Sequence, residues 1–268
     1  MRITGVINQK GGVGKTAVVA GVAGALAERG QRVLAGDLDP QGHLTVTALK
    51  LARVPVDQPS LAAALAGDYD GPTSALVTHH SITEAGGRLD LLPTSIRMWT
   101  AVRDLDKRPD RERQLGRLLD DLAGDYDHVL LDAPPALDIL TDNILAAVDG
   151  VLIPVQPEDS SLEALRLLLG QIRALERALR RPPVQLHGLV ASLYRRPLST
   201  IDGTVMDRLS EIDGLPILGH FPLAVVIKEA WRAGQPVPIH ASNTEAANAY
   251  RTLADVLDAA TDREMTVQ

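Results

Sequence analysis

The chain has 268 residues, 45% of them hydrophobic, which is enough to bury the core of an α/β domain. Its formal net charge of −7 argues against a uniformly basic nucleic-acid-binding protein, although local basic patches can still act. The sequence contains no Cys, which excludes disulfides, a cysteine nucleophile and a thiolate-held iron–sulfur cluster.

Strands and helices are predicted to alternate along the chain. Residues 3–7 form a short β-favouring run, and a helical pattern of small apolar residues extends over 16–28. Further strands are predicted at 33–37, 89–92, 127–132, 150–155 and 185–192, with helices between them. This alternation predicts an α/β fold with a mostly parallel, twisted sheet flanked by helices on both faces. We expect a single domain over residues 1–268, with irregular stretches at 52–60 and 67–81.

A glycine-rich loop, KGGVGKT at residues 10–16, lies between the first predicted strand and the first predicted helix. Strand, glycine loop and helix in this order are the context of a phosphate-binding loop, so the fold predicted is that of a P-loop NTPase. Phosphates would lie at a helix N-terminus, where free N–H groups and the helix dipole favour negative charge. The residues expected to contact the nucleotide are Gly11, Gly12, Val13, Gly14, Lys15, Thr16 and Ala17.

Lys10 is surplus to an ordinary phosphate-binding loop, which needs only the lysine at position 15. The chain holds five Lys against 22 Arg, yet two of the five are in this loop. Lys carries a compact charge on a flexible stem, whereas the planar Arg fork favours a bidentate acceptor. The second cation therefore requires a function of its own.

Carboxylates at the ends of two later strands complete a candidate magnesium site. Asp37 ends the strand at 33–37 and Asp39 follows it by two positions, while Asp132 ends the apolar run before Pro134. Carboxylate and hydroxyl oxygens at strand ends are suited to Mg²⁺ and its water. The predicted metal-site residues are Thr16, Asp37 and Asp132.

The loop at 10–16, the DLDPQG segment at 37–42 and the LLDAPP segment at 130–135 together resemble the deviant Walker ATPases. The resemblance is strongest to the ParA-type partition ATPases and covers roughly residues 1–175. It implies ATP and Mg²⁺ as cofactors, with Lys15 on the β and γ phosphates and Thr16 as a magnesium ligand. Asp132 would hold the magnesium ion through water, and Asp39 would orient the attacking water.

The same resemblance gives Lys10 its function: in this family that lysine crosses a dimer interface to the phosphates of the partner subunit. Gly11 would let the two loops approach closely, and the predicted catalytic residues are Lys10, Lys15 and Asp39. Two positions depart from the family pattern. Ala17 replaces a hydroxyl residue that touches the α phosphate, and an apolar run follows Pro222, which we retain as a nucleotide contact.

The resemblance further implies a homodimer in the ATP-bound state, non-specific DNA binding and a ParB-like centromere-binding protein that stimulates hydrolysis. We expect a cytoplasmic, nucleoid-associated protein with no membrane partner. Arginines recur along one face of the helix predicted after residue 160, where they could neutralise DNA phosphates or simply form a solvated face. The candidate DNA-binding residues are Arg166, Arg173, Arg177, Arg195, Arg196 and Lys228.

Three other functions are alternatives to DNA partition. A MinD-type positioning ATPase would need a basic amphipathic C-terminal helix, whereas residues 245–260 end acidic. A regulatory tyrosine kinase would need a Tyr-rich tail, and the four Tyr of this chain are dispersed. An ATPase that positions some other cargo stays open, because the partner and not the ATPase site selects the cargo.

Overall fold

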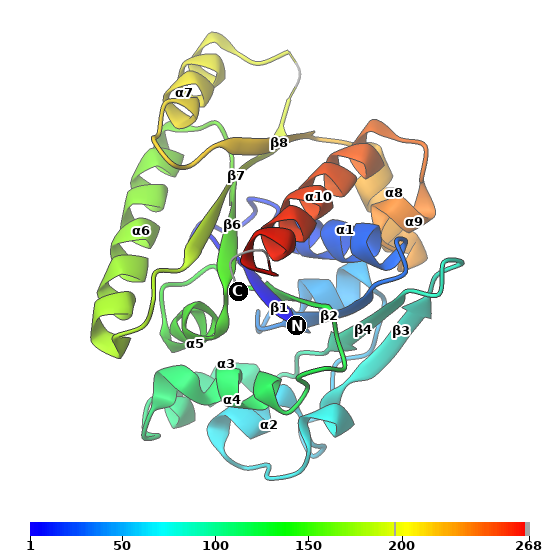
Figure 1. The fold of residues 1–268 in the computed structure, drawn as a ribbon, viewed down its shortest axis with the longest axis vertical. Coiled ribbons are helices and arrows are strands. Elements are labelled where there is room, and N and C mark those ends of the chain that lie inside the picture. Colours follow the sequence, from blue (N-terminus) through cyan, green and yellow to red (C-terminus); the bar gives the residue numbers. More distant parts are fainter. Residues whose placement is uncertain (196, 266–268) are drawn as a thin grey trace.

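The computed structural model describes residues 1–195 and 197–265, and this part of the chain forms one eight-stranded sheet (Figure 1). The strand order is β3-β4-β2-β5-β1-β6-β7-β8. Strand β3 is antiparallel to β4, and the other pairings between the described strands are parallel. The strands are β1 (Arg2–Val6), β2 (Arg32–Asp37), β3 (Thr78–Ile82), β4 (Arg88–Leu92), β5 (His128–Asp132), β6 (Gly150–Val155), β7 (Gln185–Tyr194) and β8 (Ile217–Pro222).

The central strands are apolar on both sides because helices cover both faces of the sheet. In β5, Val129 and Leu131 point into one hydrophobic cluster, whereas Leu130 points into the other. Successive side chains of a strand point to opposite faces of the sheet, so one continuous apolar run contributes to the hydrophobic core on each face. The prediction of a mostly parallel α/β sheet with helices on both faces is confirmed.

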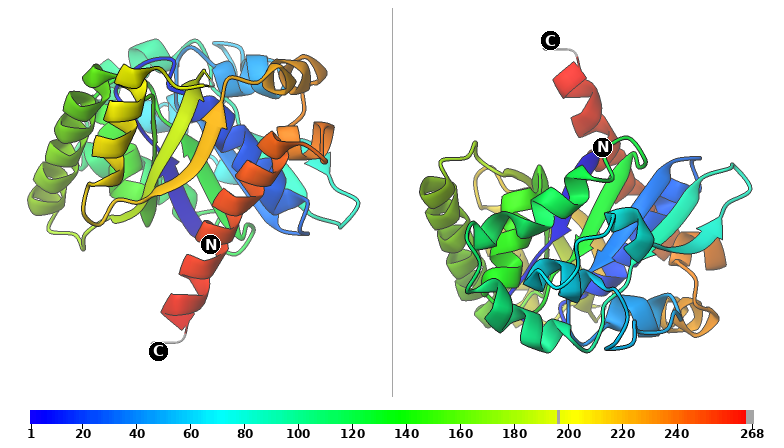
Figure 2. Two further views of the ribbon diagram at one scale, coloured as in Figure 1. Left: turned by 90° about the horizontal axis from the view of Figure 1, so that it is seen from above. Right: turned by 90° about the horizontal axis from the view of Figure 1, so that it is seen from below.

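The two faces carry different helices (Figures 1 and 2). One cluster is formed with α2 (Leu61–Ala66), α3 (Met98–Leu105), α4 (Gln114–Asp120), α5 (Ile139–Ala147), α6 (Asp159–Leu179) and α7 (Thr200–Ser210). The other cluster is formed with α1 (Lys15–Ala27), α8 (Val225–Ala233), α9 (Val237–His240) and α10 (Glu245–Met265). Short helical turns lie at η1 (His43–Ala48), η2 (Thr73–Leu76) and η3 (Arg111–Arg113).

Helix α10 packs along α1, and its C-terminal part extends beyond the sheet (Figure 2). Asp258 of α10 accepts hydrogen bonds from Arg29 (2.8 Å) and Gln31 (3.0 Å), which fasten this helix to the segment after α1. None of the described helices combines the length and the apolar character that a membrane span requires. The fold places the carboxyl ends of β1, β2 and β5 at the same edge of the sheet, where the predicted site residues meet.

Candidate nucleotide-binding site

The loop between β1 and α1 is tied to the neighbouring strands by hydrogen bonds. The Asn8 side chain donates to the carbonyl of Pro154 at the end of β6 (2.7 Å) and accepts from the Lys10 amide (2.9 Å). The hydroxyl of Ser192 in β7 donates to the carbonyl of Val13. These bonds tie the loop to the ends of β6 and β7.

The glycines of the loop permit a backbone that other residues would strain. Gly12 and Gly14 have φ values of +74° and +87°, in the left-handed region. In the described part of the chain, no side chain caps the first turn of α1, which begins directly after Gly14. The free N–H groups at this helix N-terminus therefore form an anion-binding site.

Lys15 is buried inside the loop. Its ammonium donates to the carbonyls of Asn8 (2.9 Å) and Lys10 (3.2 Å), so it lies across the curve of the loop. Burial lowers the pKa of Lys15, and the carboxylates of Asp132 and Asp39 oppose that shift. A phosphate would supply the negative charge that the buried ammonium needs.

Thr16 and Asp132 come together at the start of α1 and the end of β5. The Thr16 hydroxyl donates to Asp132 Oδ2 (2.7 Å), while Asp132 Oδ1 is buried and has no partner within residues 1–195 and 197–265. Burial, and next the charge of Asp37, raise the pKa of Asp132 well above its usual range. A divalent cation would neutralise this pair of carboxylates and use the free oxygen, so the residues fit Mg²⁺.

Asp37 and Asp39 have different surroundings although both follow β2. Asp37 is fully buried and accepts from the Thr45 amide (2.8 Å) and the Thr45 hydroxyl (2.6 Å). Burial raises the pKa of Asp37 to about 6, although these hydrogen bonds act against the shift. Asp39 instead lines the open cavity, and its carboxylate accepts from the Gln41 amide (2.9 Å). Asp39 is thus placed to meet a ligand in the cavity. Asp37 anchors η1, a turn of π-helix, which is often found at functional sites, and its buried Oδ1 has no partner among the described residues.

A cavity of about 440 Å³ opens beside the loop. Its polar side consists of residues 11–16 and Asp39, and its apolar side is formed largely by the loop before α8 and by α8 itself. The lining residues that the sequence analysis did not identify are Gln41, His43, Pro135, Leu193, Leu223, Ala224, Ile227 and Trp231. The sequence does contain one indication of this wall. Trp231 follows Ile227 by four positions, which places both side chains on one face of a helix.

Leu193 contributes an unusual backbone to this wall. Its φ is +54°, which is rare for a residue with a branched side chain, and a Cβ added at Gly14 would come within 3.4 Å of its side chain. Strained residues of this kind concentrate at ligand sites. Nothing in the sequence around position 193 predicts this conformation, because it depends on the register shift between β7 and β8.

Lys10 is directed away from this cavity. Its ammonium pairs with the carboxylate of Glu158 and donates to the Ser160 hydroxyl (3.0 Å) at the start of α6. The two lysines of the loop therefore occupy different environments, one inside the phosphate curve and one outside it. Within the described residues, no three His, Asp or Glu side chains gather into a metal site on their own, so phosphate and water oxygens would complete the magnesium shell.

The remaining predicted site residues lie in several places. Pro222 lines a smaller neighbouring cavity of about 170 Å³. Lys228 lines the nucleotide cavity rather than a separate basic face. Arg166, Arg173 and Arg177 are exposed on the outer side of α6, as the helical spacing predicts. Arg195 is exposed directly after β7, and Arg196 lies outside the described residues.

The parallel sheet, the glycine loop before α1 and the carboxylates at the ends of β2 and β5 define a P-loop ATPase. A family model described as an AAA domain matches residues 1–183. The chromosome partitioning protein ParA of Caulobacter vibrioides is 31% identical over 267 residues, which cover 98% of this chain and 97% of the relative. The chain belongs to the ParA-type P-loop ATPases, as the resemblance implied.

Solved structures agree with this assignment. Cobyrinic acid a,c-diamide synthase from Mycobacterium smegmatis with bound ADP and magnesium is 33% identical, with a TM-score of 0.76 and coverage of 96% of this chain and 94% of that chain. The septum site-determining protein MinD from Pyrococcus horikoshii, complexed with Mg-ADP, is 25% identical, with a TM-score of 0.73 and 96% coverage of both chains. The prediction of an ATPase is confirmed at the level of the family.

Proposed function

We propose that this chain is an ATP-driven partition switch, which dimerises and binds DNA non-specifically when it holds ATP. The observation that carries the proposal is the position of Lys10, which is part of the phosphate-binding loop but is directed out of its own phosphate cavity. A cation in that position is available to the phosphates of a second subunit. ATP would then become part of the dimer interface, so the nucleotide state would control assembly.

Within each subunit, the loop N–H groups and Lys15 hold the phosphates, and Thr16 and Asp132 hold Mg²⁺. When bound, Mg²⁺ neutralises the charge that develops on the phosphates. Asp39 orients the attacking water. The apolar wall of Leu223, Ile227 and Trp231 supports a place for the base in the same cavity.

The structural neighbours support the choice of ligand, since the cobyrinic acid a,c-diamide synthase was solved both with ADP and magnesium and with an ATP analogue and magnesium. The similarity to ParA supports partition as the process. A homodimer joins the basic residues of two subunits, and avidity raises DNA affinity by orders of magnitude without new contacts. Hydrolysis, stimulated by a ParB-like partner, ends the attraction between subunits and releases the DNA. The protein would act in the cytoplasm at the nucleoid.

The proposal is tested by changing Lys10 to Ala and Lys107 to Ala. Lys107 is an exposed cation that does not line the nucleotide cavity, and its ammonium pairs with Asp104 at 3.2 Å. We expect the Lys10→Ala chain to bind a non-hydrolysable ATP analogue but to remain monomeric in analytical ultracentrifugation. Its affinity for a random DNA duplex should fall at least tenfold, whereas Lys107→Ala should match the wild type. A Lys10→Ala chain that still dimerises with the analogue would refute the switch.

A ParA-like ATPase that positions another cargo is the second candidate, which the similarity to MinD favours. Measurement of DNA binding by the wild-type chain separates the two candidate functions. Salt-dependent binding of the duplex with the ATP analogue and not with ADP supports partition. Dimerisation with no DNA binding would instead support the other cargo.

A further inference from the structure

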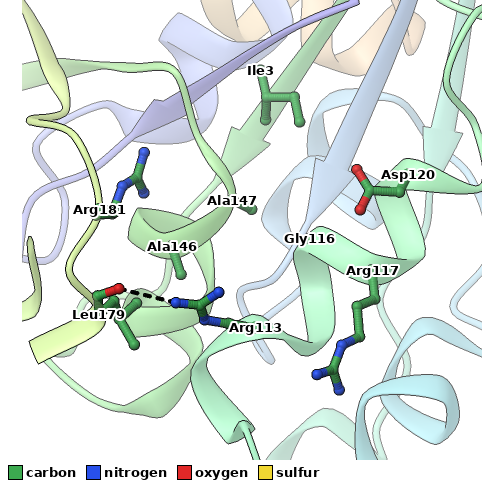
Figure 3. A pocket seen from close by; sticks show the side chains of 9 residues that line it. All are labelled: Ile3, Arg113, Gly116, Arg117, Asp120, Ala146, Ala147, Leu179 and Arg181. Atoms are coloured by element: carbon green, nitrogen blue, oxygen red, sulfur yellow. Dashed lines mark hydrogen bonds between the residues drawn. The ribbon is translucent and has the colours of Figure 1, made fainter.

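A second cavity, of about 350 Å³, lies at the edge of the sheet where the strands begin, opposite the edge that carries the phosphate loop. Its walls come from the end of η3, from α4, from the C-terminal ends of α5 and α6 with the segment after α6, and from Ile3 of β1 (Figure 3). Arg113, Arg117 and Arg181 line it, against one carboxylate, Asp120. No part of the nucleotide site reaches this cavity.

Two of these arginines are fixed in place by backbone carbonyls. Arg181 donates to the carbonyls of Leu145 and Val148 (2.7 Å) at the end of α5, and Arg113 donates to the carbonyl of Leu179 (3.0 Å) at the end of α6. A cation at a helix C-terminus interacts favourably with the free carbonyls there. The guanidinium groups are thereby held on the cavity wall (Figure 3).

Neither of these two arginines forms a contact ion pair among the described residues. In the part of the chain that the structure describes, neither Arg113 nor Arg181 has a carboxylate within 4.0 Å, whereas Arg117 is paired with Asp110 at 2.7 Å. Burial lowers the pKa of Arg181, the charges of Glu176 and Asp149 oppose that shift, and the nearby charge of Arg113 adds to it. Asp120 lies on the opposite side of the cavity from Arg181 (Figure 3).

We propose that this cavity binds a small phosphomonoester, with its phosphate between Arg113 and Arg181. A phosphate dianion matches two guanidinium groups in charge, and each planar fork can donate two parallel hydrogen bonds. The cavity is larger than a phosphate ion, and Ile3, Ala147 and Leu179 provide an apolar surface for the body of the ligand. The site is separate from the ATP site and does not depend on it.

The test is calorimetric titration of the full chain with inorganic phosphate and with ribose 5-phosphate. Every protein in this titration carries Lys15→Ala, so that the ammonium of the phosphate loop is absent. The titration therefore reports on the second cavity whether or not the phosphate loop binds ATP. We expect one saturable site, with ribose 5-phosphate bound more tightly than inorganic phosphate because its sugar uses the apolar surface. Equal affinities would identify free phosphate as the ligand and overturn the phosphomonoester.

Three further variants locate the site. Arg113→Gln should weaken binding at least tenfold, whereas Arg166→Gln, the same change on an exposed position of α6, should alter it less than twofold. Asp120→Asn, which removes a repulsive charge from the cavity wall, should tighten binding about threefold. Circular dichroism melts confirm that each variant is folded. Absence of saturable binding, or an equal loss in Arg113→Gln and Arg166→Gln, would overturn the site.

Discussion

At the scale of single residues, the burial of the polar His187 ring costs folding free energy that no hydrogen bond offsets. It is 7% exposed, and both ring nitrogens lack a partner in the described part of the chain. Its ring packs on the bare Cα of Gly150, where an added Cβ would come within 2.4 Å. Burial, and next the charge of Arg2, lower the pKa of His187 to about 4. The residue is therefore neutral in the folded chain at neutral pH.

This lowered pKa predicts a specific loss of stability in acid. The unfolded chain takes up a proton on His187 near pH 6.5 but the folded chain does so only near pH 4, so stability falls as pH drops through this window. Between pH 7 and pH 5 the loss is about 2 kcal/mol from this side chain. His187→Leu should remove that component, measured as the difference between the two proteins in urea unfolding at each pH. Parallel pH profiles would show that His187 does not titrate in this way.

Some residues of the phosphate site can be predicted from the sequence, and others cannot. The loop glycines, Lys15 and Thr16 are contiguous, and their chemistry is readable from the motif itself. The cavity wall is not, because Leu193 and Trp231 come from segments that only the sheet order brings to the loop. Apolar side chains at such positions look the same in sequence as ordinary core residues.

At the scale of elements, the central strands were predictable and the edges were not. Strand β5 is a continuous apolar run, which is typical of a strand buried on both faces. Strand β3 (Thr78–Ile82) contains two His and a Ser, and β8 (Ile217–Pro222) contains Gly, His and Pro. Edge strands bury less surface, so their sequences show less of the apolar pattern that identifies a strand. Their pairing depends instead on the adjacent strand of the sheet. The π-helical η1 depends on the buried contact between Asp37 and Thr45, which no periodicity reveals.

Helix α1 packs closely on its neighbours through two glycines. A Cβ at Gly21 would come within 2.4 Å of the Tyr250 ring of α10, and one at Gly24 would come within 2.3 Å of Pro236. Tyr250 is itself fully buried beside Phe221, with ring centroids 4.7 Å apart. Gly21 therefore sets the distance at which α10 packs on α1, and Gly24 sets the approach of Pro236, the residue before α9.

Gly21→Ala should accordingly destabilise the chain, although Ala is the better helix former. Overpacking of this kind costs about 1–3 kcal/mol, which exceeds the gain in helix propensity of about 1 kcal/mol. Gly170→Ala is the matched control, because Gly170 lies in α6 with no heavy atom within 4 Å of its added Cβ. That variant should gain up to about 1 kcal/mol. Urea midpoints that move in the same direction for both variants would contradict this packing.

At the scale of the whole molecule, the contact between Lys10 and Glu158 links the phosphate loop to α6. Both side chains are partly exposed, at 26% and 52%, so the pair contributes little to folding. It does hold the Lys10 ammonium against its own subunit. If Lys10 reaches the partner subunit in the proposed dimer, each subunit must first break this pair.

Glu158→Gln should therefore favour the dimer. An exposed pair is worth about 0.5 kcal/mol, and two pairs break per dimer, so the dissociation constant with a saturating ATP analogue should fall about fivefold. Glu163→Gln is the control, since Glu163 lies in the first turns of α6, the helix that Glu158 precedes, and it pairs with Arg166 at 4.0 Å. Sedimentation velocity over a concentration series measures both constants. A weaker dimer in Glu158→Gln alone would mean that Glu158 contributes a contact across the interface, and the intrasubunit pair would then not be what restrains assembly.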